Sequence, residues 1–440
     1  MKVLKFGGTS VGSPSSIKEV ANIVRNIEGK KTVVLSAMSG TTNALHEVAD
    51  YIINYKEEEA NQLIDDLIAK YVDVAHELLN EKENQEAAIA LISDRFEYIR
   101  EHVGIEIPSS QIEKNIVAQG EVLSTNLFIF HLKEEGAKAT LVSAFDFMAI
   151  DEANEPVISK ITEAYGEIVA ANTNTEIFVT QGYICLSHRG KIDNLKRGGS
   201  DYSASLIGAA IKAEEIQIWT DIDGMHNNDP RFVENTFSLK ELSFDEAAEL
   251  AYFGAKILHP QSVIPARKAN VPVMLKNTFE PNAAGTIIKN CDVPAGVRAI
   301  AAKDGITAIK IKSYRMLMAY GFLKGVFQVF ENYKTSIDMI TTSEVAVSLT
   351  IDDTTHLNEI VKELEEIGSV EVDTDLSIIC LAGNFTEESK GASSPIFNSL
   401  TNIPIRMISY GGSNYNVSLV INTENKKEAL VALNKGVFGR

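Results

Sequence analysis

Residues 2–10 read KVLKFGGTS, a β-rich apolar run that ends in two adjacent glycines, and Ser13-Pro14 follow closely. Serine is a preferred N-cap and proline a preferred first helical residue, so this stretch predicts a strand, a tight loop and a helix. Adjacent glycines there let backbone N–H groups approach a phosphate, at which the helix directs its positive end. A Gly-Gly pair after a strand is also typical of an ordinary turn, so the stretch alone leaves both interpretations open. It is neither GxxxxGK[ST] nor GxGxxG, because Thr9 stands where the second motif needs glycine.

The alternation of short β-rich runs with longer helical runs continues to about residue 290. A long helix-periodic region, roughly 42–135, separates the second predicted strand from the third. Strands that alternate with helices pair in parallel through helical crossovers. The sequence therefore predicts an α/β protein whose first part is an αβα sandwich with a mostly parallel central sheet. The predicted strands are Lys2–Phe6, Lys31–Ser36, Ala139–Ser143, Glu176–Thr180, Glu215–Thr220 and Val271–Asn277.

An internal repeat follows. Residues 307–311, 325–327 and 347–351 match 377–381, 395–397 and 417–421, each at an offset of 70 residues. A constant offset over three elements indicates a duplicated unit. The first copy reads βαββαβ, a ferredoxin-like module, and the second lacks a last strand that Arg298–Ala302 could supply.

We therefore expect three domains: a catalytic domain at 1–296, an inserted module at 303–374, and a second module made of 297–302 plus 375–440. Exposed module edges invite sheet pairing between chains, so a homodimer or a tetramer is expected.

Charge and composition exclude some partners. The 440 residues hold 41 Lys and Arg against 60 Asp and Glu, a net charge of −19. This balance argues against a broad surface for nucleic acid or an anionic membrane, because both are polyanions. No stretch approaches 18 apolar residues and no cleavable signal pattern is present, so a cytoplasmic protein is expected. Cys185, Cys291 and Cys380 are too few and too far apart for a disulfide framework or a CxxC metal site.

Four further segments carry candidate chemistry: SAMSGTTN at 36–43, KRGGSD at 196–201, TDIDGMHNNDPR at 220–231 and GAKILHP at 254–260. Each also has a structural interpretation. Thr42 or Asn43 could cap a helix, KRGGSD could be a solvated loop, and Lys256 could be a surface lysine after a helix-ending glycine. A calcium loop that starts at Asp221 is excluded, since its sixth and twelfth residues are not glycine and glutamate.

Together with Gln119-Gly120-Glu121, these segments resemble those of the aspartokinases, the amino acid kinases that make aspartyl phosphate. KFGGTSV, VLSAMSGTTN, RGGSD, TDIDG…DPR and GAKILHP occur in the order and spacing of that family. GFL…VF and DMITTSE, residues 338–344, resemble its regulatory ACT modules. The resemblance covers essentially the whole chain. It implies an amino acid kinase fold followed by two ACT modules, and ATP-dependent phosphorylation of the aspartate side chain. That reaction opens the synthesis of lysine through diaminopimelate, and of threonine and methionine.

The resemblance also implies residue roles. Lys5 would stabilise the migrating phosphoryl group, and Asp201 would hold Lys5 in place. The implied aspartate contacts are Thr42, Glu121, Arg197 and Ser200. The implied contacts of ATP, which would arrive with Mg²⁺ on unidentified protein ligands, are Lys5, Gly7, Gly8, Ser10, Thr220, Asp221, His226, Arg231 and Lys256. Three positions depart from the family pattern: Ser39 and Lys196 replace glycines, and His226 replaces a tyrosine, which bears on adenine or ribose contacts.

Such a site suits the chemistry. A carboxylate acceptor with a pKa near 3.9 is already ionised at pH 7, so it needs no general base. The difficulty is the repulsion between two anions, roughly 4 kcal/mol for each unit pair at about 4 Å and an effective dielectric of about 20. Several fixed positive groups are therefore required, and positioning and charge neutralisation carry the reaction.

ACT modules resemble one another in binding small amino acids, and in aspartokinases the effector is an end product of the pathway. The candidate effector contacts are Met316, Phe322, Leu323, Ile337, Asp338, Ser343 and Glu344. The carboxylates of Asp338 and Glu344 favour a ligand with more than one ammonium group, so lysine is predicted and threonine is the second candidate. Met316 and Leu323 could equally be core residues.

Two alternatives remain at this stage. One is an amino acid kinase that acts on another substrate such as glutamate, against which Arg197, Glu121 and the two modules argue. The other is a catalytically silent amino-acid sensor, against which the intact charged residues argue.

Overall fold

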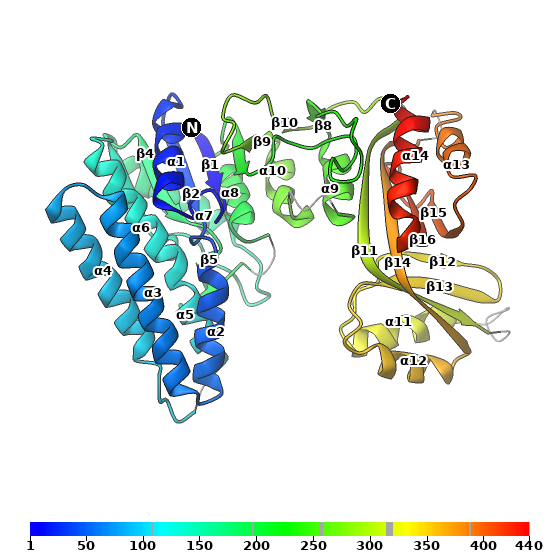
Figure 1. Ribbon diagram of the computed structural model, residues 1–440, viewed down its shortest axis with the longest axis horizontal. Coiled ribbons are helices and arrows are strands. Elements are labelled where there is room, and N and C mark those ends of the chain that lie inside the picture. The colour runs from blue at the N-terminus through cyan, green and yellow to red at the C-terminus, as the bar shows by residue number, and fades with distance from the viewer. Residues whose placement is uncertain (108, 196–197, 255–257, 314–319, 387–388, 440) are drawn as a thin grey trace. The chain divides into compact units, whose positions relative to one another are not determined.

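The computed structural model describes residues 1–107, 109–195, 198–254, 258–313, 320–386 and 389–439 (Figure 1). They form two compact units. The first is built from Met1–Met225, Leu239–Phe244 and the described part of 257–291, and the second from His226–Ser238 and the described parts of 245–256 and 292–440. Among the described residues, no helix combines the length and the apolar character that crossing a membrane requires.

The first unit is organised around an eight-stranded sheet with the order β3-β4-β2-β1-β7-β9-β10-β8. Its strands are β1 (Lys2–Phe6), β2 (Lys31–Leu35), β3 (Ala139–Val142), β4 (Ile177–Gln181), β7 (Ile216–Thr220), β8 (Glu241–Leu242), β9 (Val273–Asn277) and β10 (Thr286–Ile288). All neighbours pair in parallel except β9 and β10. The mostly parallel sheet is thus confirmed, and each of the six predicted strands is present within two residues of its predicted ends. A separate ribbon pairs β5 (Ile184–Leu186) with β6 (Ile192–Asn194).

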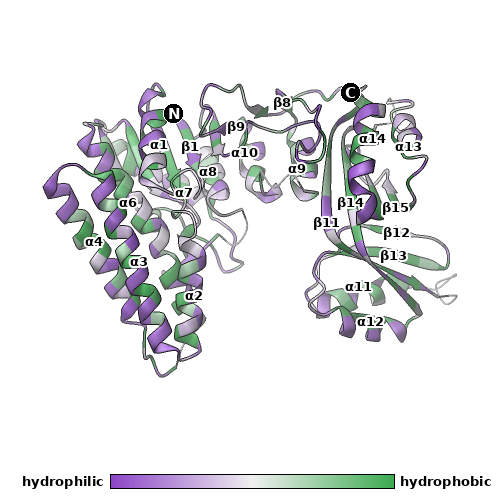
Figure 2. Ribbon diagram, viewed as in Figure 1, coloured by the Kyte–Doolittle hydropathy of each residue, from purple (hydrophilic) through white to green (hydrophobic). Residues whose placement is uncertain are grey.

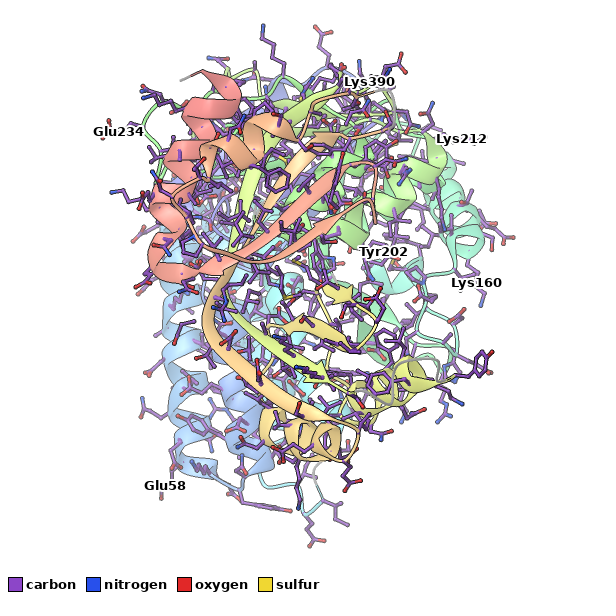
Figure 3. The ribbon with its side chains drawn as sticks, turned by 90° about the vertical axis from the view of Figure 1, so that its right-hand side faces the viewer. Glu58, Lys160, Tyr202, Lys212, Glu234 and Lys390 are labelled. Carbon is purple, nitrogen blue, oxygen red and sulfur yellow. The ribbon has the colours of Figure 1, made fainter. Side chains whose placement is uncertain are left out.

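Helices of the first unit follow the predicted pattern. The region 42–135 forms five of them, of which α3, α4 and α6 run alongside one another (Figure 1). Figure 2 shows hydrophilic and hydrophobic residues mixed around α3 and α4, as amphipathic helices require. Exposed charged side chains such as Glu58 and Lys160 point outward (Figure 3). The helices are α1 (Pro14–Asn26), α2 (Thr41–Ile53), α3 (Glu57–Leu78), α4 (Lys82–Arg100), α5 (Ser110–Val117), α6 (Gln119–Glu134), α7 (Ile158–Ala171), α8 (Gly199–Ala210) and α10 (Ile264–Ala269).

The predicted cap at Ser13 and the possible cap at Thr42 or Asn43 have different outcomes. The Ser13 side chain accepts a hydrogen bond from the Ser16 N–H at 3.2 Å, which confirms the cap of α1. The alternative interpretation of Thr42 or Asn43 as a cap does not hold. Helix α2 begins at Thr41 after Gly40, whose φ of 79° is left-handed and which makes no side-chain cap. Glycine adopts that conformation without strain, so the backbone turns into α2 before a side chain is needed.

The second unit contains a six-stranded antiparallel sheet with the order β12-β13-β11-β14-β16-β15. Its long central strands, β11 (Gly296–Lys312) and β14 (Ser369–Asn384), each serve both copies of the repeat. Ile309 pairs with Val372 in one half and Ile300 with Leu381 in the other, where β11 supplies the edge strand that the second copy lacks. The other strands are β12 (Ile340–Thr342), β13 (Ala346–Ile351), β15 (Ile405–Tyr410) and β16 (Asn416–Asn422).

Each half of this sheet has its own helices and its own apolar core. The helices α11 (Phe322–Asn332) and α12 (Leu357–Glu365) pack on the first half, and α13 (Ser394–Ser399) and α14 (Lys426–Phe438) on the second. Strand side chains alternate between faces. Ile309 and Ile379 thus face the module helices, whereas Ala308 and Ile378 form a third apolar cluster on the opposite face. Phe253, next to the end of α9 (Phe244–Tyr252), packs into that third cluster.

Candidate active site

Lys5 and Asp201 are brought together at the carboxyl end of the central strand. Lys5 lies near the end of β1, and Asp201 lies in the first turn of α8, where the positive end of the helix stabilises a carboxylate. The distance from Lys5 Nζ to Asp201 Oδ1 is 2.7 Å, and the two side chains are 12% and 16% exposed. The lysine is thus held in one orientation and still reaches solvent, as a group that meets a diffusing substrate must.

The first two glycine-containing loops pack directly against each other. The Ser39 N–H donates to the Gly8 carbonyl at 3.1 Å, and the Ser36 N–H donates to the Phe6 carbonyl at 3.2 Å. A Cβ atom added at Gly8 would lie 2.9 Å from the Ala37 carbonyl oxygen. Gly8 is therefore required for the close contact of the two loops.

Glu121 is a buried carboxylate with one open oxygen. It lies in the first turn of α6 and is 3% exposed. Its Oε1 accepts a hydrogen bond from the Ala37 N–H at 3.2 Å, whereas Oε2 is buried and has no hydrogen-bond partner among the described residues. Burial raises the pKa of Glu121 to about 7, although the Ala37 N–H opposes the shift. A cation placed at Oε2 would satisfy this carboxylate and favour its charged form.

Hydrogen bonds link the predicted substrate contacts to the second glycine-containing loop. Ser36 Oγ donates to Ser200 Oγ at 2.9 Å, and Ser124 Oγ of α6 donates to the Ser36 carbonyl at 2.9 Å. Gly182 leaves the room that Ser200 fills, since an added Cβ would lie 2.3 Å from its side chain. Thr42, in the first turn of α2, is half-buried.

The predicted nucleotide residues divide between the two units. Gly7, Gly8, Ser10, Thr220 and Asp221 belong to the first, and His226 and Arg231 to the second. Ser10 is buried and its Oγ lies 2.7 Å from Thr278 Oγ1. The Thr278 N–H in turn donates to the Thr220 carbonyl at 2.8 Å. Thr278 was not predicted, and the available signal was its place directly after β9, at the edge where parallel strands end.

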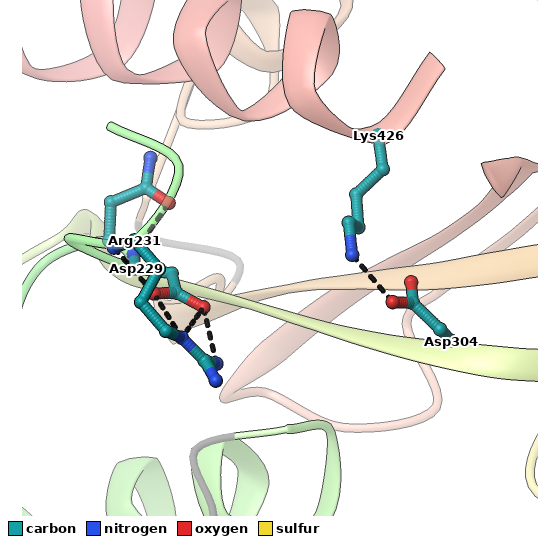
Figure 4. A network of polar contacts seen from close by, with 5 residues as sticks. Asp229, Arg231, Asp304 and Lys426 are labelled. Atoms are coloured by element: carbon teal, nitrogen blue, oxygen red, sulfur yellow. Dashed lines mark hydrogen bonds and ion pairs between the residues drawn. The ribbon is translucent and has the colours of Figure 1, made fainter. Parts of the chain in front are cut away.

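His226 and Arg231 have partners of their own in the second unit. His226 Nδ1 lies 3.2 Å from Thr236 Oγ1. The guanidinium of Arg231 makes an ion pair of 2.7 Å with Asp229 (Figure 4). In the same network Lys426 binds Asp304 at 2.5 Å (Figure 4). The segment that carries both predicted residues is tied to α14 of the second unit by two neighbouring amides: Asn227 donates to Asn434 Oδ1 at 2.9 Å and Asn228 to the Leu430 carbonyl at 3.0 Å.

Three predicted site residues, Arg197, Lys256 and Met316, lie outside the described residues. Among those that are described, no group of three or more His, Cys, Asp or Glu side chains is spaced to hold a metal ion.

The predicted effector residues lie in or near the first module. Asp338 has a side chain only 1% exposed, and its Oδ1 accepts hydrogen bonds from Lys303 Nζ and the Tyr252 hydroxyl, both at 2.9 Å. Ser343 and Glu344 are exposed in the turn between β12 and β13. Phe322 and Ile337 pack against the first-module core, whereas Leu323 is exposed and is not a core residue.

Comparisons with known proteins show which family this chain resembles in sequence and in fold. A profile of the amino acid kinase family matches residues 1–277, and a profile of the ACT domain matches residues 379–436. The chain is 32% identical over 454 residues to lysine-sensitive aspartokinase 3 of Escherichia coli, covering 99% of both chains. The crystal structure of E. coli aspartokinase III with aspartate and ADP in the R-state matches with a TM-score of 0.84 and 31% identity over 100% of both chains. The T-state of that enzyme with lysine and aspartate has the same TM-score and identity, over 100% of this chain and 99% of that one.

Proposed function

Since this chain belongs to the amino acid kinase family and, within it, to the aspartokinases, we propose the following account of its reaction and regulation. The enzyme transfers the terminal phosphoryl group of ATP to the side-chain carboxylate of L-aspartate, giving 4-phospho-L-aspartate and ADP. This is the first step towards lysine, threonine and methionine. The observation that carries the proposal is Lys5, held 2.7 Å from Asp201 at the carboxyl end of β1.

Charge neutralisation by fixed groups accounts for the chemistry. The substrate carboxylate is ionised at neutral pH and attacks without a general base. The ammonium group of Lys5 offsets the negative charge that the two substrates bring together, and Asp201 keeps that ammonium in place before the substrates arrive. Because the lysine needs no reorientation during transfer, its stabilising effect is fully available in the transition state.

Glu121 is the proposed contact of the substrate α-ammonium group. Its open, buried Oε2 is an acceptor without a protein donor among the described residues, and a bound ammonium would supply both hydrogen bond and charge. Ser200 and Thr42 would contact the same substrate, and Arg197 would bind one of its carboxylates.

We propose that ATP contacts Gly7, Gly8, Ser10, Thr220 and Asp221 from the first unit, and His226, Arg231 and Lys256 from the remaining predicted positions. Mg²⁺ would enter together with ATP and would offset part of the negative charge of its phosphates.

The regulatory proposal rests on the modules. Lysine is the proposed effector, with threonine the second candidate, because Asp338 and the exposed Glu344 offer two carboxylates.

The strands β12 and β15 end the six-stranded sheet, and such edges support pairing of chains into a dimer or tetramer. We further propose three domains: a catalytic domain at 1–296, a first module at 303–374, and a second module made of 297–302 plus 375–440. The proposed location of the enzyme is the cytoplasm.

A hydroxamate assay tests the reaction. Purified enzyme with MgATP and hydroxylamine is expected to give acyl hydroxamate from aspartate and none from glutamate. Product from glutamate but not from aspartate would refute the substrate assignment. In the same assay, an initial velocity that stays constant up to millimolar lysine would remove lysine as the effector.

A further inference from the structure

Helix α9 belongs to the kinase part of the chain by sequence and to the regulatory part by packing. It lies within residues 1–277, which match the amino acid kinase family. Nevertheless, the described residues from Asp245 onward in this segment form one compact unit with the modules. A change in the modules, such as effector binding, can therefore act on α9 and through it on the kinase segments that precede and follow it in the chain.

One side of α9 contacts both modules. The Glu249 carboxylate accepts hydrogen bonds from Ser413 Oγ, at 2.9 Å, and from the Asn416 side chain, in the second module. Three residues later, the Tyr252 hydroxyl donates to Asp338 Oδ1 of the first module at 2.9 Å. Phe253 is buried in the apolar cluster on the face of the sheet opposite the module helices.

The chain leaves α9 at a point where the backbone touches the sheet. Gly254 has a φ of 126°, and a Cβ atom added there would lie 2.1 Å from the Ala302 carbonyl oxygen of β11. Only glycine fits this contact. The end of α9 is therefore held against the modules by close packing as well as by hydrogen bonds.

Asp338 is closed to a ligand while Tyr252 is in place. Its side chain is 1% exposed, and its Oδ2 is buried without a hydrogen-bond partner among the described residues. Lys303 is bound to two carboxylates, Asp338 at 2.9 Å and Asp352 at 2.8 Å. Tyr252 makes a single hydrogen bond to Asp338 and is itself 41% exposed. Of these two neighbours, Tyr252 is the one that an incoming ammonium group can displace.

The repeat also bears on the second-module contact of α9, one turn before Tyr252. Ser413 of the second module corresponds, at the offset of 70 residues, to Ser343 in the candidate effector site of the first. In the second module that position is occupied by the Glu249 carboxylate of α9. The same helix thus fills one of the two related turns and covers the carboxylate beside the other.

We propose that Tyr252 and the effector compete for Asp338, so that effector binding releases the end of α9 from the first module. This inference rests on the proposed function, since it takes lysine as the effector. A ligand that binds only when Tyr252 is displaced shifts the population towards the released helix. By linkage, weakening the hold on α9 strengthens effector binding by the same factor.

The decisive variant is Tyr252→Phe, which removes one hydroxyl. The hydrogen bond from Tyr252 to Asp338 then no longer competes with lysine for that carboxylate. The dissociation constant for lysine is therefore expected to fall about tenfold. Calorimetry on the full-length enzyme measures it. The lysine concentration for half-inhibition should fall by the same factor. The matched control is Tyr333→Phe, which removes a hydroxyl that donates to Glu363 at 2.7 Å in the same module and should leave both values unchanged.

A second variant tests release without touching Asp338. Glu249→Ala frees α9 from the second module and should also tighten lysine binding, although Glu249 contacts no predicted effector residue among its hydrogen-bond partners. Lysine binding that is unchanged in Tyr252→Phe, while the wild type is inhibited normally, would overturn this inference alone. A wild-type enzyme that neither binds lysine nor responds to it would overturn the proposed effector and this inference with it.

Discussion

The ammonium nitrogen of Lys5 lies 2.7 Å from Oδ1 of Asp201, joining the end of β1 to the first turn of α8. Each partner stabilises the charge of the other, and the start of α8 further favours the carboxylate. The ion pair therefore positions a cation at the edge of the sheet before any substrate binds.

Lys5→Met should abolish most of the activity. It removes the cation that offsets the charge of the migrating phosphoryl group, and the loss of one such group costs about 100-fold or more in kcat. Hydroxamate formation measures the loss, and circular dichroism should show an unchanged fold. The matched control is Lys2→Met on the same strand, whose ion-pair distance to Glu215 is 4.0 Å. Equal losses in both variants would contradict a catalytic role for Lys5.

Asp201→Asn should lower kcat through Lys5. The amide keeps the shape of the side chain but no longer holds the ammonium group by charge. Residues that act as a unit are non-additive, so the Lys5→Met, Asp201→Asn double variant should be no slower than Lys5→Met alone. Additive losses in kcat in this cycle would show that the two side chains act separately.

Glu121 should make stability and aspartate binding depend on pH. Its pKa in the folded enzyme is raised from 4.5 to about 7 by burial, so between these values the folded state holds a proton that the unfolded chain has lost. The free energy of unfolding of the substrate-free enzyme should therefore fall as pH rises from about 4.5 to 7. Thermal melts of the wild type and Glu121→Gln across this range measure the effect, which the variant should lack.

Aspartate binding should favour the charged form of Glu121, whereas the stability of the substrate-free enzyme favours the protonated form. The substrate ammonium needs the charged carboxylate, so the KM for aspartate should rise as pH falls below about 7. In Glu121→Gln, the KM for aspartate should be at least about tenfold higher than in the wild type at pH 8. A variant with an unchanged KM for aspartate would show that the ammonium binds elsewhere.

Gly182→Ala should weaken aspartate binding through Ser200. The added methyl group would lie 2.3 Å from the Ser200 side chain, so Ser200 and its hydrogen bond from Ser36 must move. The KM for aspartate is expected to rise several-fold. The control is Gly166→Ala in α7, where an added Cβ meets nothing within 4 Å and stability should be equal or slightly higher. If both variants have the wild-type KM, Ser200 is not a substrate contact.

Local patterns were sufficient for much of the architecture. Alternating strand and helix signals identified six strands of the first sheet, because hydrophobic periodicity and capping residues act over a few neighbours. The constant offset of 70 residues identified the duplicated module for the same reason, since both copies need the same buried positions. Neither Thr42 nor Asn43 caps α2, because a left-handed Gly40, not a side chain, begins that helix.

The assembly of distant segments required the folded chain. No spacing rule indicates that Lys5 contacts Asp201, or that the buried Glu121 keeps one oxygen without a partner in the described part of the chain, because both depend on which loops meet at the end of the sheet. Only tertiary packing decided that α9 faces Asp338 and Ser413. Helix formation depends on neighbours three or four residues apart, whereas the choice of a packing partner depends on apolar surfaces and polar groups far away along the chain.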